Sequence, residues 1–570
     1  MLDLHPKNKM GGVLAPLFAL RGSSDLGVGD TQALHELVDW CAEIGLSVIQ
    51  ILPINETGID HSPYNILSSL AIEPSTITTT PEFLPELAVE DFSFITSKYD
   101  LPRMRAREVC YVEVKALKLE LLGAAFKRLS DSAKIRAFRN FQEENKEWLQ
   151  PYTLFRSMVH LHGQSEFFQH WPAEEREYAS AQKWAAELQG EKKIFLEHLQ
   201  DFYSYIQWIA FSQWQDLRRY AESRKVALMG DIPVGVSLHS ADVWAHPHLF
   251  DLTRSCGAPA EKEFYVDGFT KNWGQNWGFP LYNWTEMFQN NLSWWRRRLR
   301  IWRSIFHMLR IDHVLGFFRM YTFPWYPSDN IRFASLNEEA TRGLTGGHLP
   351  RFMDQDDSTE GNRQKNRARG EALLRIFLEE TEPYHLIAED LGMVPPYARP
   401  SLQELEIPGL KIPIWERDEQ GELIRGPDYH RLSLATYGTH DHPPLKARWQ
   451  QWIQDAASEE PARSHSAVSQ MRDLLNFAEH PNSEVPQPFT ENLHLALLKG
   501  LFACNSWLAV PLITDFFGTE HEFNVPGSAA ESNWKTRLEI PVALWMTEKK
   551  ALISRVQTIL KTTCRKILYD

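Results

Sequence analysis

Short apolar runs recur along the chain, and longer segments with helical patterning separate most of them. Seven of the runs have the length and composition of fully buried strands. They are "SVIQILPI" (47–54), "VALMGDIPV" (226–234), "HMLRIDHVLGFF" (307–318), "HLIAEDLG" (385–392), "GLKIPIW" (409–415), "LSLATYGTHD" (432–441) and "WLAVPLITDFFG" (507–518). Residues 30–45 illustrate the helical pattern, because Asp30 or Thr31 can cap a helix in which leucines and Trp40 recur at helical spacing. Strands that alternate with helices indicate a parallel sheet buried on both faces.

For a chain of 570 residues, this alternation predicts an α/β fold, namely a closed (β/α)8 TIM barrel. We expect a single catalytic domain over residues 1–570, with mostly helical insertions between strands and no separate C-terminal β-domain. The largest insertion runs from about residue 76 to 220, where the sequence is charged, helix-patterned and poor in strand signals. Residues 345–370 are polar and contain glycine, which predicts a surface loop near the barrel mouth.

Composition narrows the class of ligand. The formal net charge of −14 argues against nucleic acid as a partner, because nucleic acid requires a basic face. No apolar run reaches membrane-spanning length. The stretch "GGVLAPLFAL" (11–20) is a weak candidate for a signal-peptide core, but no small-residue cleavage site follows it. The five cysteines are scattered without a CxxC pair, which is typical of a reducing compartment. We therefore expect a cytoplasmic protein without structural zinc.

Four of the predicted strands end in carboxylates. The acidic strand ends are Asp231, Asp312, the pair Glu389 and Asp390, and Asp441. A single acidic residue at a strand end often caps the following helix, but four strands of one sheet favour a pocket lined by carboxylates. Arg310 and Asp312 are two residues apart, so in a strand both point to the same side. In a barrel that side is the lumen, near the end where barrel enzymes build their active sites.

The motifs that are missing restrict the chemistry. The chain has no P-loop, no GxGxxG after a strand, no HExxH and no GxSxG. Magnesium bound by the acidic strand ends is an alternative, but Arg310 beside Asp312 and His440 beside Asp441 are unfavourable neighbours for a divalent cation. An ionised Asp with a protonatable Glu is the apparatus of glycoside transfer. The sequence therefore favours carbohydrate chemistry without a metal or another cofactor.

A series of motifs along nearly the whole chain resembles the 4-α-glucanotransferases (amylomaltases, or disproportionating enzymes) of glycoside hydrolase family 77. The motifs are "PLFALRGSSDLGVGD", "QILPINETG…SPYNILSS", "GDIPVGVSLHSADVWAHP", "GAP", "GQNWGFPLYNW", "RIDHVLGFFR", "LIAEDLGMVP", "ATYGTHD" and "FNVPGSAAESNWKTRL". Each string alone is weak evidence, whereas the ordered combination is specific. "GQNWGFPLYNW" and "RIDHVLGFFR" are most similar to the plant-cytosol type.

The resemblance implies roles for individual residues. Asp312 is expected to be the nucleophile, Glu389 the general acid/base, and Asp441 the residue that holds hydroxyls of the distorted sugar ring. The expected substrate-binding residues are Arg310, His313, His440, Tyr64, Asp231, Trp277 and Tyr282. The implied substrates are α-1,4-glucans and maltooligosaccharides, with glucose or another glucan as acceptor, bound by a monomer or homodimer.

Two departures from the family pattern concern the acceptor side and the third carboxylate. Residues 257–273 form a longer loop than usual, with Glu261 where the family has an Asp, and we expect this loop at the active-site rim. "HPP" follows Asp441 where small polar residues are common. Two alternatives to a transferase remain open at this point. They are an α-1,4-glucan hydrolase on the same fold and a catalytically silent glucan-binding protein.

Overall fold

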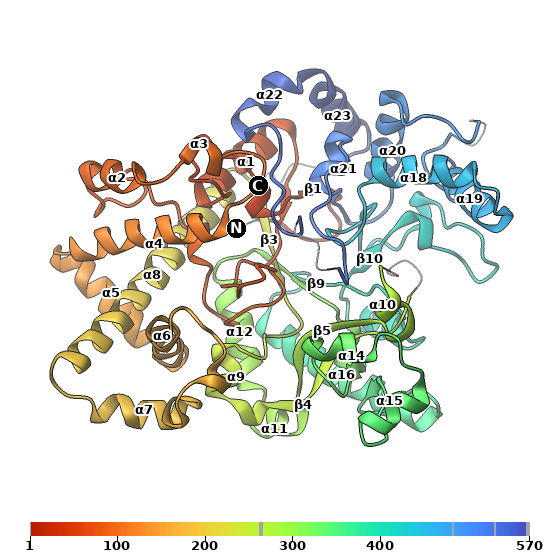
Figure 1. The fold of residues 1–570 in the computed structure, drawn as a ribbon. Coiled ribbons are helices and arrows are strands. Elements are labelled where there is room, and N and C mark those ends of the chain that lie inside the picture. The colour runs from red at the N-terminus through yellow and green to blue at the C-terminus, as the bar shows by residue number, and fades with distance from the viewer. Residues whose placement is uncertain (1, 262–265, 481–483, 529–531, 566–570) are drawn as a thin grey trace.

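Eight parallel strands form a barrel at the centre of the molecule (Figure 1). The computed structural model describes residues 2–261, 266–480, 484–528 and 532–565. The barrel strands are β1 (Met10–Leu14), β2 (Val48–Gln50), β3 (Ala227–Ile232), β6 (Met308–Ile311), β9 (Leu386–Ala388), β10 (Gly409–Lys411), β11 (Ser433–Ala435) and β12 (Leu508–Ala509). Their order in the sheet is β10-β11-β12-β1-β2-β3-β6-β9. The Ala388 N–H at the β9 edge donates to Pro408 O, just before β10, at 2.9 Å. The two edges of the sheet therefore meet, and the (β/α)8 prediction is confirmed.

Each of the seven predicted apolar runs contains one barrel strand. The eighth strand, β1, lies where the sequence offered a weak signal-peptide core, and it pairs in parallel with both β12 and β2. Glycines made its strand signal weak. Gly12 is needed there, because a Cβ at this position would lie 2.6 Å from the carbonyl oxygen of Val48 on β2. The close approach of the two backbones therefore explains the glycines, which weaken the strand pattern in the sequence.

Helices connect most of the barrel strands. Those that precede or follow them are α1 (Thr31–Ile44), α8 (Gly190–Ser223), α12 (Ser293–Arg303), α16 (Glu360–Glu380), α17 (Ala398–Glu404), α20 (Glu491–Ala503) and α23 (Lys550–Thr562). In α1 the Asp30 side chain accepts the N–H of Ala33, and Gly45 ends the helix in the left-handed region with φ 94°. After β12 the described residues contain helices and loops but no further sheet.

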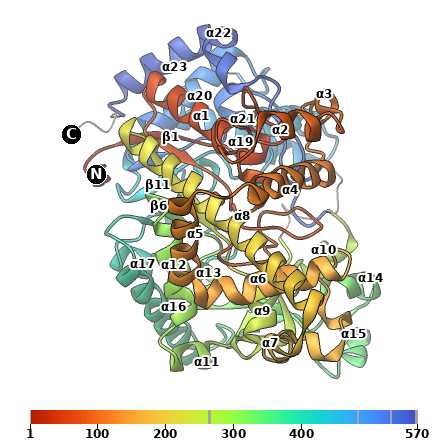
Figure 2. The same cartoon turned by 90° about the vertical axis from the view of Figure 1, so that its left-hand side faces the viewer.

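The 76–220 interval is helical. Its helices are α2 (Val89–Thr96), α3 (Leu101–Met104), α4 (Tyr111–Lys127), α5 (Ser132–Glu144), α6 (Lys146–Leu161), α7 (Tyr178–Glu187) and most of α8. In Figure 1 they gather on one side of the barrel, and in Figure 2, where that side faces the viewer, the long α8 runs across them. This last helix returns the chain to β3.

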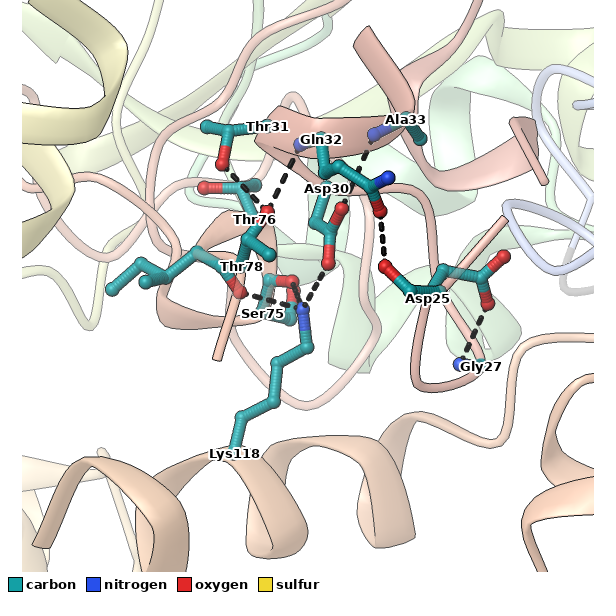
Figure 3. A network of polar contacts seen from close by, with 12 residues as sticks. Asp25, Gly27, Asp30, Thr31, Gln32, Ala33, Ser75, Thr76, Thr78 and Lys118 are labelled. Atoms are coloured by element: carbon teal, nitrogen blue, oxygen red, sulfur yellow. Dashed lines mark hydrogen bonds and ion pairs between the residues drawn. The ribbon is translucent and has the colours of Figure 1, made fainter. Parts of the chain in front are cut away.

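A buried polar network joins the insertion to the barrel (Figure 3). The Lys118 ammonium group on α4 is fully buried, and it lies 3.2 Å from an Asp30 oxygen at the start of α1. The same ammonium donates to the carbonyl oxygens of Ser75 and Ile77, both at 2.7 Å. A buried charge needs such partners, because desolvation is otherwise costly. The network therefore fixes the insertion against the first barrel helix.

A second, antiparallel sheet stands beside the barrel mouth. Its strands are β4 (Phe250–Ala258), β5 (Gln275–Tyr282), β7 (Met320–Phe323) and β8 (Arg351–Met353), in the order β5-β4-β7-β8. The prediction of a loop over 345–370 is thus wrong in part, because this segment holds β8 and the first half of α16, where Thr359 caps the helix. The polar composition reflects a short edge strand and the exposed side of a helix.

The expected rim loop 257–273 has regular structure at both ends. It begins with the last residues of β4 and ends with α10 (Gly268–Trp273), which a capping box between Asp267 and Thr270 starts. Residues 262–265 lie outside the described residues.

Candidate active site

Arg310 is the centre of the carboxylate cluster. Parallel pairing of β3 and β6 places it directly opposite Asp231, so the two side chains share a face of the sheet. Its Nη1 donates to both Asp231 oxygens, at 2.6 and 2.5 Å, and lies 3.3 Å from Asp312 Oδ1. Its Nη2 lies 3.9 Å from Glu389 Oε2. One buried guanidinium therefore contacts three of the acidic strand ends that the sequence singled out.

Backbone donors position the two carboxylates that flank Arg310. Glu389 accepts the N–H of His313 on Oε2 at 2.7 Å and the N–H of Leu391 on Oε1 at 2.9 Å. Asp312 Oδ2 lies 3.4 Å from the N–H of Val234 beyond β3. Asp312 directly follows β6 and Glu389 directly follows β9, and these strands are neighbours. The two carboxyl groups therefore project from adjacent strand ends.

Burial raises the pKa values of these two carboxyl groups to different levels. It raises the pKa of Glu389 to about 8, with Asp312 adding to the effect and Arg310 opposing it. Burial also raises the pKa of Asp312, to about 6, and Arg310 again opposes the shift. Both shifts favour protonation, and the larger one at Glu389 makes it the better proton holder of the pair. This is the arrangement of an acid beside an ionised carboxylate.

Asp441 follows β11 and has different partners. Its Oδ2 lies 3.2 Å from His440 Nε2, and its Oδ1 accepts a hydrogen bond from Asn524 Nδ2 at 2.7 Å. Burial alone would raise the pKa of Asp441, but His440 and the Asn524 hydrogen bond outweigh it and hold the pKa well below its usual range. Asp441 is therefore a permanent anion and hydrogen-bond acceptor.

Tyr64 joins the two halves of the cluster. Its hydroxyl donates to Asp231 Oδ2 at 2.7 Å and lies 3.3 Å from His440 Nδ1. The Tyr64 and His440 rings are stacked, with centroids 4.7 Å apart and planes at 14°. The buried His440 side chain thus orients Asp441 from behind, whereas Tyr64 itself lines the cavity.

His313 and Trp277 form the side of the site that faces the second sheet. His313 has φ 42°, a strained conformation for a residue other than glycine. That turn in the chain points its N–H at Glu389. Trp277 on β5 meets the His313 ring edge-on, with centroids 4.9 Å apart. Burial lowers the pKa of His313 to about 4, so this imidazole is neutral at pH 7.

A cavity of about 1330 Å³ opens over this cluster. Asp312, Glu389 and Asp441 all line it, as do Arg310, His313, Tyr64 and Trp277. Sequence reasoning missed several lining residues, among them Asn524, Trp534, Arg319, Tyr321 and Phe352. The first two lie in the motif "FNVPGSAAESNWKTRL", whose place in the family resemblance is the signal that could have identified them.

Three of the predicted substrate-binding residues lie behind the cavity wall, and one of them is His440, which is buried and not among the described residues that line the cavity. Tyr282 is buried, its hydroxyl donates to Val234 O at 2.8 Å, and it is not among the described residues that line the cavity. The position of Tyr282 near the end of β5, packed against the rings of Trp294 and Trp295, accounts for its burial. Asp231 is likewise buried under Arg310. All three residues contact groups that line the cavity, and the expectation of direct sugar contact does not fit these positions.

The described residues contain neither a cluster of metal ligands nor a candidate membrane span. No group of three His, Cys, Asp or Glu side chains stands where it could hold a metal ion. Among the described residues, no helix is both long enough and apolar enough to cross a bilayer.

Comparisons with known proteins agree with the geometry. A family model described as 4-alpha-glucanotransferase, that of glycoside hydrolase family 77, matches residues 15–543. The 4-alpha-glucanotransferase of Chlamydia caviae is 29% identical over 550 residues, covering 94% of this chain and 92% of that protein. The rice 4-alpha-glucanotransferase DPE2 is 33% identical over 379 residues, covering 65% of this chain and 37% of the rice protein.

Solved structures support the fold. The amylomaltase of Streptococcus agalactiae, solved in complex with acarbose, is 22% identical with a TM-score of 0.74, and the match covers 98% of this chain and all of that one. The amylomaltase of Corynebacterium glutamicum is 21% identical with a TM-score of 0.77, covering 98% of this chain and 75% of that one.

Proposed function

The chain belongs to the 4-alpha-glucanotransferase family, glycoside hydrolase family 77, and we propose that it transfers α-1,4-glucan segments by double displacement with Asp312 as nucleophile and Glu389 as acid/base. The observation that carries this proposal is the position of the Arg310 guanidinium, which lies 3.3 Å from an Asp312 oxygen and 3.9 Å from a Glu389 oxygen. Retaining enzymes need these groups about 5–5.5 Å apart, and a shared cation favours such closeness.

In the first step an Asp312 oxygen attacks the anomeric carbon of the donor sugar. The bond from that carbon to the glycosidic oxygen breaks, and the Glu389 proton goes to the departing oxygen. The raised pKa of Glu389, about 8, supports this role because the group still holds its proton at neutral pH. Arg310 favours the ionised form of Asp312 that must attack.

In the second step the ionised Glu389 takes the proton from the 4-hydroxyl of an acceptor. The acceptor oxygen bonds to the anomeric carbon, and the ester to Asp312 breaks, which regenerates both carboxyl groups. Asp441, held anionic by His440 and Asn524, would accept hydrogen bonds from hydroxyls of the distorted sugar. Its lasting negative charge suits a binding role.

Transfer rather than hydrolysis requires that an acceptor outcompete water. Water is present at roughly 55 M, but the effective molarity of a well-placed reactant can exceed this by orders of magnitude. Aromatic rings such as Tyr64 and Trp277 in the cavity wall would provide that placement. Maltooligosaccharides are the proposed donors, and glucose or another glucan is the proposed acceptor.

Incubation of the purified protein with maltotriose alone tests this proposal. Chain-length separation should reveal glucose and a ladder of longer glucans, while a parallel reducing-end assay stays nearly constant. Reducing ends that rise as fast as maltotriose disappears would identify a hydrolase. Maltotriose that is bound but never converted would identify a silent glucan-binding protein.

A further inference from the structure

A short turn after β3 contacts the residue proposed as nucleophile. The Val234 N–H lies 3.4 Å from Asp312 Oδ2, whereas Arg310 contacts the other carboxylate oxygen, Oδ1. The backbone N–H of Asp312 donates to the carbonyl oxygen of Ile232, the last residue of β3, at 3.0 Å. The turn over residues 232–235 therefore contacts both the backbone and the side chain of Asp312, so its position influences that of the attacking carboxylate.

Two residues of β5 hold this turn in place. The Tyr282 hydroxyl donates to the Val234 carbonyl oxygen at 2.8 Å. Phe279 packs directly on the next residue of the turn, because a Cβ at Gly235 would lie 2.3 Å from the Phe279 ring. Val234 is thus bonded to the second sheet through its carbonyl and to Asp312 through its N–H. A displacement at the first contact is therefore transmitted to the second.

Aromatic neighbours fix the Tyr282 side chain. Its ring contacts the rings of Trp294 and Trp295 on α12, with centroids 5.7 and 5.6 Å away. The Arg298 guanidinium carbon lies 4.9 Å from the centroid of the Trp295 ring. Burial raises the pKa of the Tyr282 hydroxyl, and Arg298 opposes the shift. The hydroxyl therefore keeps its proton throughout the neutral pH range and remains a donor to Val234.

Tyr282 can act on the reaction only through other groups. It is 5% exposed and is not among the described residues that line the cavity, so it does not touch the donor sugar. Its path to the reacting atoms runs through Val234 to Asp312. Attack on an anomeric carbon depends steeply on geometry, since a misplacement of about 1 Å can cost roughly 100-fold in rate.

We propose that Tyr282 is a positioning residue for the nucleophile, acting through its hydrogen bond to Val234. This inference rests on the proposed function, because it takes Asp312 as the attacking group. Binding of the donor is unaffected by such a role, because the sugar does not touch Tyr282. The rate of attack, in contrast, depends on it for natural and activated donors alike.

The test is Tyr282→Phe, which removes the hydroxyl and keeps the ring in its packing. The first-turnover burst of fluoride release from α-maltosyl fluoride isolates the attack by Asp312. We expect the burst rate constant at saturating donor to fall about ten-fold, less than the full cost of a 1 Å misplacement, because Arg310 still contacts Asp312. The donor concentration at half-saturation should change less than two-fold. For maltotriose, kcat/KM should fall by the same factor as the burst rate constant.

Tyr437→Phe is the matched control. Tyr437 is also buried, its hydroxyl donates to the carbonyl oxygen of Leu497 on α20, and neither residue is among the described residues that line the cavity. This variant loses a comparable hydrogen bond, so its burst rate constant should stay within two-fold of the wild-type value. Thermal unfolding should show that both variants are folded at the assay temperature.

Three results would overturn the positioning role. They are an unchanged burst rate constant in Tyr282→Phe, a change in half-saturation alone, and an equal loss of rate in Tyr437→Phe. A wild-type protein that makes no transfer product would instead overturn the proposed function.

Discussion

The pH dependence of transfer follows from the two shifted carboxyl groups. Asp312 must be ionised to attack, and its pKa of about 6 means that activity is lost as the pH falls through 6. Glu389 must be protonated to release the leaving group, and its pKa of about 8 means that activity is lost as the pH rises through 8. We therefore expect a bell-shaped profile of kcat/KM centred near pH 7.

The pKa values of Asp312 and Glu389 set how far activity falls on either side of the optimum. At pH 7 each group is about nine-tenths in its working form, so about 80% of the enzyme is competent. At pH 5 only about 10% of Asp312 is ionised, and at pH 9 only about 10% of Glu389 is protonated. Activity at either pH should therefore be about eight- to ten-fold below the maximum.

The assay measures initial rates of maltotriose disproportionation from pH 4.5 to 9.5 and repeats the series with α-maltosyl fluoride, following fluoride release. Fluoride departs without a proton, so the alkaline limb should vanish from its kcat/KM profile while the acidic limb remains. Glu389→Gln should likewise retain the first-turnover burst of fluoride release, because only the second step then needs Glu389, and should lose reaction with maltotriose. An alkaline limb that persists with the fluoride donor would refute the assignment of Glu389 as the acid.

Three other outcomes are expected. Asp312→Asn should abolish turnover but retain glucan binding in a calorimetric titration, since only the nucleophile is lost; residual transfer with retention would point to another nucleophile. Chelator treatment should leave activity unchanged, because Arg310 already neutralises the acidic strand ends, and activity restored by added calcium or magnesium would contradict this. Lys118→Ala should lower the free energy of unfolding by about 3–5 kcal/mol, since Asp30 loses its buried partner; denaturant unfolding measures it, with exposed Lys7→Ala as the neutral control.

Much of the barrel and of the catalytic cluster could be predicted from the sequence because both depend on short-range patterns. Apolar runs of strand length identified seven strands, and a period of two placed Arg310 and Asp312 on one side of theirs. The cap and the glycine at the ends of α1 are equally local signals. The strand β1 was not predicted, because glycines needed for close packing against β2 weaken its apolar pattern.

Tertiary structure alone decided which side chains meet. Asn524 lies 83 residues from Asp441, and the pairing of β11 with β12 brings together the segments that follow these strands, so that its amide reaches that carboxylate. Tyr321 and Phe352 are 31 residues apart, on β7 and β8, so no local pattern could show that they face each other. Tyr282 was predicted to contact sugar, yet packing turned it inward to bond Val234. The sequence by itself determined the strands and the acidic residues at their ends. The fold determined the raised pKa of Glu389, because burial beside Asp312 and Arg310 is a property of the assembled barrel.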